Sequence, residues 1–92
     1  MSKINEFKKI TESMANTYER KNVDYGDSFG ESFEEFGLIS SVVRMNDKMN
    51  RLKSFVNNGD YQVKDESVKD TLLDLANYCI MTVIELNNQA QK

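Results

Sequence analysis

Hydrophobic residues recur every three or four positions in three stretches of the chain, which is the spacing of one face of an α-helix. These stretches cover residues 2–21, 38–56 and 67–88. Ser2 suits a helix N-cap, and Gly59, which follows two asparagines, is typical of a helix C-terminus. The pattern therefore predicts an all-α fold, a small bundle of three main helices.

The third stretch is apolar over more than half of its circumference. Its apolar positions are Val68, Leu72, Leu73, Leu75, Ala76, Cys79, Ile80, Val83, Ile84 and Leu86. A helix of this kind is either central to its domain or shared with another subunit. Because only two further helices of the chain are available to cover this apolar surface, we expect a homo-oligomer, at least a dimer. A tight monomeric three-helix bundle is the alternative.

Residues 22–37 differ from these three stretches in composition. Three glycines lie there among the aromatic residues Tyr25, Phe29, Phe33 and Phe36. Glycine, aspartate and serine favour turns, so this segment is predicted to be a packed loop with at most a short helical turn over residues 31–36. Its aromatic rings either stack on a nucleobase, at about 1–3 kcal/mol per base, or plug the end of a small core.

The second predicted helix carries a basic side opposite its methionines. Arg44, Lys48 and Arg51 follow one another at steps of four and three, with Ser40 and Asp47 on the same side. Three cations in a row suit a phosphate or pyrophosphate group, and arginine can donate to two of its oxygens. The alternative is a series of surface ion pairs, which contribute little to stability.

The third predicted helix carries an acidic side. Glu66, Asp70, Asp74 and Asn77 follow steps of four, four and three, which places them on one face. Carboxylates four residues apart repel each other unless a cation lies near, and oxygen ligands of this kind suit Mg²⁺. The alternative is a solvated face near the positive end of the helix dipole.

Composition narrows the classes of function. The 92 residues suffice for one domain, and 12 basic against 15 acidic residues argue against a nucleic-acid polymer as ligand. The chain has neither a membrane-span-sized apolar run nor an N-terminal signal-peptide pattern, so we expect a cytoplasmic protein with no membrane partner. Without histidine, a Ser-His triad is excluded. The single cysteine, Cys79, is expected to be a buried structural thiol.

Three segments occur in an order that resembles a known family. They read KNVDYGDSF at residues 21–29, GLISSVVRMNDKMNRL at 37–52 and DESVKDTLLDLANY at 65–78. This pattern resembles the small phage and bacterial proteins called nucleotide modification associated domains, first type. It is more distantly similar to the MazG all-alpha nucleotide pyrophosphatases. The resemblance covers residues 21–86 and implies a role in nucleotide metabolism and a MazG-like helical fold.

The similarity to MazG implies a site in which acidic residues on two helices hold Mg²⁺ against a triphosphate while water attacks to release pyrophosphate. Asp70 and Asp74, helped by Glu66 and Asn77, match the place of the later acidic pair. On the earlier helix, where the family has paired glutamates, this chain has a single acidic residue, Asp47, among three basic ones. That departure weakens hydrolysis more than it weakens phosphate binding.

We therefore expect a phage-type protein that binds a phosphorylated nucleotide without efficient turnover, for example an anti-defence sponge that sequesters a host cyclic nucleotide signal. The expected nucleotide contacts are Arg44, Lys48, Arg51, Tyr25, Phe29, Asp47 and Asn77. One alternative is a MazG-like pyrophosphatase, in which Asp70, Asp74 and Glu66 hold Mg²⁺ with Asp47. A second alternative is a structural or protein-binding helical module.

Overall fold

Every element that the structure describes is a helix. The computed structural model describes residues 2–59 and 66–91, which form α1 (Lys3–Tyr25), α2 (Ser28–Phe36), α3 (Leu38–Asn58) and α4 (Glu66–Ala90). The predicted all-α class is confirmed, and the three predicted main helices correspond to α1, α3 and α4. The described residues form a fourth, shorter helix, α2, where a loop was predicted. Most of the expected polar connection between α3 and α4, with Tyr61 and Val63, lies outside the described residues.

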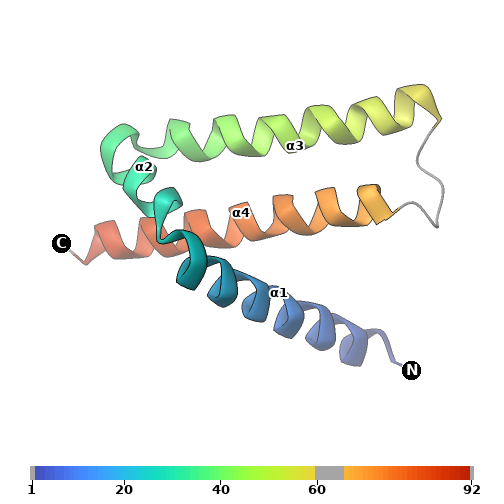
Figure 1. Cartoon of the computed structure of the whole chain (residues 1–92), viewed down its shortest axis with the longest axis horizontal. Helices are drawn as coiled ribbons and strands as arrows, with labels where there is room; N and C mark the ends of the chain where they lie inside the picture. The colour runs from blue at the N-terminus through green and yellow to red at the C-terminus, as the bar shows by residue number, and fades with distance from the viewer. Residues whose placement is uncertain (1, 60–65, 92) are drawn as a thin grey trace.

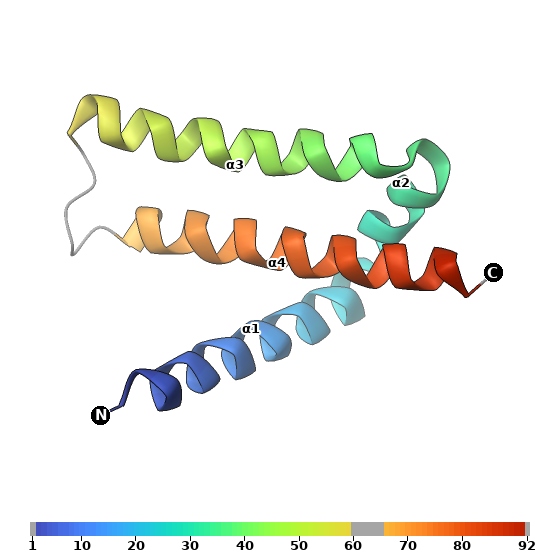
Figure 2. The same cartoon turned by 180° about the vertical axis from the view of Figure 1, so that it is seen from behind.

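The helices form an antiparallel hairpin to which the N-terminal half of the chain is attached. α3 and α4 run side by side and make the most extensive contact in the molecule (Figures 1 and 2). The short α2 lies across one end of this hairpin and contacts both of its helices. α1 meets α4 near the α2 end and diverges from it toward the N-terminus, which leaves a wedge between α1 and α4 (Figure 1).

The helix ends explain why the segment predicted as a loop is helical. α1 continues past Lys21 to Tyr25, and Asp27 then caps α2 by accepting a hydrogen bond of 3.0 Å from the Gly30 backbone N–H. Gly37 has a φ of +80°, which side-chain-bearing residues rarely adopt, and it joins α2 directly to α3. Two glycine breaks thus separate three helices, where turn propensity alone indicated one long loop.

Both helix-end predictions are confirmed. The Ser2 side chain accepts a hydrogen bond of 3.2 Å from the backbone N–H of Asn5 and so caps α1. Gly59 adopts the left-handed conformation that ends α3, and its N–H bonds back to the carbonyl groups of Phe55 and Val56.

The buried core is small and sits where α2 meets the hairpin. Among the described residues its apolar members are Phe29 and Phe33 of α2, with Met14 of α1 buried beside the wedge between α1 and α4, and Phe33 is 2% exposed. Phe36, on the same short helix, is 64% exposed. Two of the aromatic residues of the 22–37 segment, Phe29 and Phe33, are therefore part of the core.

None of the described helices is long and apolar enough to cross a bilayer.

A small buried side chain on α3 and a contact between two sulfur atoms lie within the α3–α4 hairpin. Ser41 of α3 is fully buried, and a residue of this size lets neighbouring helices approach closely. The Cys79 thiol lies 3.6 Å from the Met45 sulfur across the two helices. Cys79 is on the apolar side of α4 but is exposed, so the expectation of a buried thiol is wrong. The reason is that α1 and α2 contact α4 on the side of the cavity, whose lining does not include Cys79.

Replacing Phe33 with alanine should lower the free energy of unfolding by about 3–5 kcal/mol, because it removes a buried ring and leaves a cavity. The matched control is Phe36→Ala, which removes the same ring from the exposed side of α2 and should cost less than about 1 kcal/mol. Urea unfolding followed by circular dichroism measures both. Equal losses in the two variants would contradict the placement of the core.

Candidate functional site

The basic side of α3 is anchored at two points that face other helices. The Lys48 ammonium lies 3.3 Å from a carboxylate oxygen of Asp74 on α4. The Arg44 guanidinium donates a hydrogen bond of 3.4 Å to the Ser32 hydroxyl on α2 and lies 5.3 Å from the centre of the Phe29 ring. The cationic side of α3 and the acidic side of α4 therefore face each other at Lys48 and Asp74.

An aromatic pair forms the base of this region. Phe29 of α2 and Tyr78 of α4 stack with 5.8 Å between their ring centres and 11° between their planes. Phe29 is 5% exposed, because Tyr78 and Arg44 pack against its ring. Its ring is thus part of the packed wall and offers no open face to a base, while the half-buried Tyr78 borders free space.

A cavity of about 340 Å³ lies between these side chains. It is lined by Thr17, Tyr18, Lys21 and Asn22 of α1, Gly26, Ser28 and Phe29, Arg44 and Lys48 of α3, and Asp74, Asn77, Tyr78 and Met81 of α4. The described charged residues of this lining are three cations and one carboxylate, in a chain whose net charge is −3. This volume is at the lower end of the range for small-molecule sites. The cavity therefore concentrates positive charge in an otherwise acidic protein.

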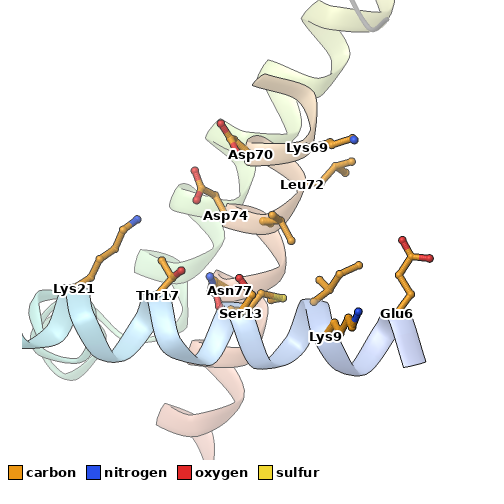
Figure 3. Close-up of a pocket in the computed structure, with 13 residues that line it drawn as sticks. Glu6, Lys9, Ser13, Thr17, Lys21, Lys69, Asp70, Leu72, Asp74 and Asn77 are labelled. Atoms are coloured by element: carbon orange, nitrogen blue, oxygen red, sulfur yellow. The ribbon is translucent and has the colours of Figure 1, made fainter. Parts of the chain in front are cut away.

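A larger groove of about 1020 Å³ adjoins the cavity in the wedge between α1 and α4. Its floor is apolar, with Ile10, Met14, Leu72 and Leu73, and its rim carries charged residues of both signs. Figure 3 shows Lys21 extending from α1 on the same side of α4 as Asp70 and Asp74. Thr17, Lys21, Asp74 and Asn77 line both spaces, so the cavity and the groove form one continuous concave surface.

The structure brings together four of the predicted nucleotide contacts and separates others from them. Arg44, Lys48, Phe29 and Asn77 line the cavity, together with Asp74 from the predicted metal set. Asp70 lines the adjoining groove.

Two predicted residues of α3 lie elsewhere. Arg51 is exposed and lies 5.7 Å from the ring centre of Phe55 on its own helix, and Asp47 is exposed. Neither residue lines the cavity or the groove. Tyr25 and Glu66 fall within α1 and α4, but their side chains lie outside what the structure describes.

Sequence reasoning missed the contribution of α1. Lys21 and Thr17 line the cavity, and they continue the apolar stripe of α1 from Met14 at steps of three and four. The signal that could have revealed them is their spacing, because Thr17 and Lys21 are polar residues on the same helix face as the apolar stripe. Tyr78 was also missed, since its stacking partner comes from a distant part of the sequence.

The carboxylates on the acidic side of α4 are the candidate ligands for a metal ion. Asp70 and Asp74 are one helical turn apart, and Asp74 is already paired with Lys48. Within the described part of the chain, no three acidic or sulfur ligands cluster as a metal site would require. Asp70 and Asp74 could hold Mg²⁺ together with water molecules and the oxygens of a bound phosphate, which is a common way for Mg²⁺ to bind.

The family of the chain follows from its sequence. The sequence model described as nucleotide modification associated domain 1 matches residues 21–86. The chain belongs to this family. Neither a curated protein nor a solved structure matches the chain. The matched region includes α2, α3, most of α4 and the end of α1 that carries Lys21, so nearly all of the cavity lining lies within the nucleotide modification associated domain.

Proposed function

We propose that this nucleotide modification associated domain binds a phosphorylated nucleotide in the cavity between its four helices. The observation that carries the proposal is the convergence of Lys21, Arg44 and Lys48 from two helices on one concave space. Arginine and lysine are the side chains that bind phosphate most often, and Arg44 is oriented by its contacts with Ser32 and Phe29. The family description supports a nucleotide as the source of the phosphate.

Each part of a nucleotide has a chemically suitable neighbour in this cavity. Lys21, Arg44 and Lys48 would neutralise the phosphate oxygens. Tyr78 presents an aromatic ring at the cavity, and Asn77 presents an amide with both donors and acceptors, which suits the edge of a base or a sugar hydroxyl. Phe29 supports Tyr78 from behind.

Binding without efficient turnover agrees better with this geometry than hydrolysis does. Asp74 is the one described carboxylate of the cavity lining, and it lies against the Lys48 ammonium. A metal bound at Asp74 would have to compete with that ammonium. The protein would therefore hold its nucleotide intact, as a sponge for a cyclic or modified nucleotide signal in phage anti-defence does.

The second candidate is a MazG-like Mg²⁺-dependent pyrophosphatase, and one observation favours it. Asp70 and Asp74 both line the groove that adjoins the cavity, so a triphosphate extending from the cavity would reach two carboxylates. In that case Asp70 and Asp74 would hold Mg²⁺ and orient the phosphates, and the metal would supply an activated water.

Replacing Arg44 with alanine should weaken nucleotide binding at least tenfold, or about 1.4 kcal/mol, because it removes charge-assisted hydrogen bonds to phosphate. Arg51→Ala is the matched control, since it removes the same side chain from the same helix outside the cavity. Isothermal titration calorimetry with nucleoside triphosphates and cyclic dinucleotides measures both. If Arg51→Ala weakened binding as much as Arg44→Ala, or if neither variant changed it, the cavity would not be the phosphate site.

The Asp74→Asn variant distinguishes binding from hydrolysis. It removes the carboxylate that competes for Lys48, so a metal-independent binder should keep or increase its affinity, and the ligand should be recovered intact by mass spectrometry. A pyrophosphatase would instead require Mg²⁺, release pyrophosphate and lose this activity in Asp74→Asn. Asp47→Asn, an exposed carboxylate outside the cavity, is the control and should change neither property.

A further inference from the structure

The α3–α4 hairpin has an apolar side that no part of the described chain covers. Its exposed members are Val42, Met49 and Val56 of α3 and Val83 and Leu86 of α4. We call this surface the hairpin apolar face. Each of these side chains is more than 40% exposed, which is unusual for five large hydrophobic residues on two adjacent helices.

Spacing and one direct contact show that the two halves of this face are continuous. Met45 of α3 touches Cys79 of α4 at 3.6 Å. Met45 lies one helical turn from Val42 and from Met49, and Cys79 lies one turn from Val83. The exposed residues therefore extend in both directions from the point where the two helices touch.

The face points away from the cavity. At about 100° per residue, Arg44 and Lys48 are rotated by more than a quarter of a turn from Val42 and Met49 around the axis of α3. α1 and α2 lie on the cavity side and contact α4 there. A partner on the hairpin apolar face would leave the cavity open.

The surface area of the chain supports such a partner. A compact monomer of 10.6 kDa would expose about 5,500 Å², whereas this chain exposes 7135 Å². Its radius of gyration is 14.9 Å, against about 12 Å expected for a compact domain of this length. The excess of roughly 1,600 Å² is about twice what one partner contributes to a standard interface. The chain therefore has enough uncovered surface for a stable, obligate contact.

We infer that a second copy of this chain packs on the hairpin apolar face, so that two α3–α4 hairpins form a four-helix bundle around a two-fold axis. A two-fold interface requires a surface that is complementary to itself. Two antiparallel apolar helices meet this requirement, because hairpin against hairpin is the arrangement of a four-helix bundle. The pair buries the methionines and Cys79 in its centre and leaves one cavity on each outer side.

The experiment measures molar mass by light scattering after gel filtration, with circular dichroism to verify helix content. The wild type should have twice the 10.6 kDa mass of one chain. Val83→Glu, at a residue 55% exposed in the single chain, should reduce the mass to one chain or lower the dimer affinity at least a hundredfold. Met49→Glu, on the other helix, should do the same, so the result does not rest on one variant.

The matched control is Val23→Glu, because Val23 of α1 is 81% exposed but lies off the face, and this variant should remain a dimer. Cys79 gives a second readout that does not depend on mutation, since its thiol should react slowly with an alkylating reagent in the wild-type dimer and faster on dilution. A single-chain mass for the wild type would overturn the inference. So would a dimer that persists in both Val83→Glu and Met49→Glu. Neither result bears on nucleotide binding, which is measured separately.

Discussion

The packing of the Phe29 ring is the contact on which the rest of the site depends. Phe29 comes from the short α2, stacks on Tyr78 of α4 and lies under the guanidinium of Arg44 from α3. One ring thus fixes three helices relative to one another. Because Phe29 and Phe33 supply two of the three apolar side chains that are buried among the described residues, the position of α2 and the position of the cationic groups have the same physical cause.

As a result, one side of the α3–α4 hairpin is charged and the opposite side is apolar. The side that α2 braces carries the cations, the cavity and the Lys48–Asp74 ion pair. The opposite side carries exposed hydrophobic residues and the Met45–Cys79 contact. With so few buried residues, a single chain has little free energy available for folding, since stability comes mainly from apolar burial. In our account the second copy supplies the missing burial, and the cavity side stays free for a ligand.

Periodicity was sufficient to predict most of the fold, because α1, α3 and α4 each carry a clear apolar stripe and recognisable ends at Ser2 and Gly59. It failed for α2, where three glycines suggested turns. Asp27 caps this helix, and the burial of Phe29 and Phe33 stabilises it. Local residue propensities do not reveal either effect. For the candidate site, spacing predicted a cationic side of α3 and an acidic side of α4, and these two sides meet at Lys48 and Asp74.

Other parts of the site could not be obtained from spacing. Arg51 shares the face of Arg44 by sequence, yet the cavity is bordered only by the part of α3 that carries Arg44 and Lys48, and Arg51 lies against Phe55 of its own helix. Lys21 and Tyr78 enter the cavity through contacts between distant segments, which one-dimensional patterns do not encode. Cys79 was expected to be buried because its helix face is apolar, but its thiol is exposed, because α1 and α2 pack against the cavity side of α4 instead.

The central claim is that a phosphorylated nucleotide occupies the cavity beside Arg44, and chemical-shift mapping tests it most directly. The amide and arginine side-chain NMR signals of uniformly labelled protein are followed while a nucleoside triphosphate or a cyclic dinucleotide is added. The account predicts saturable shifts concentrated at Lys21, Arg44, Asn77 and Tyr78, with Arg51 unaffected. Weak shifts spread over all the lysines and arginines, or no shifts with either ligand, would contradict it.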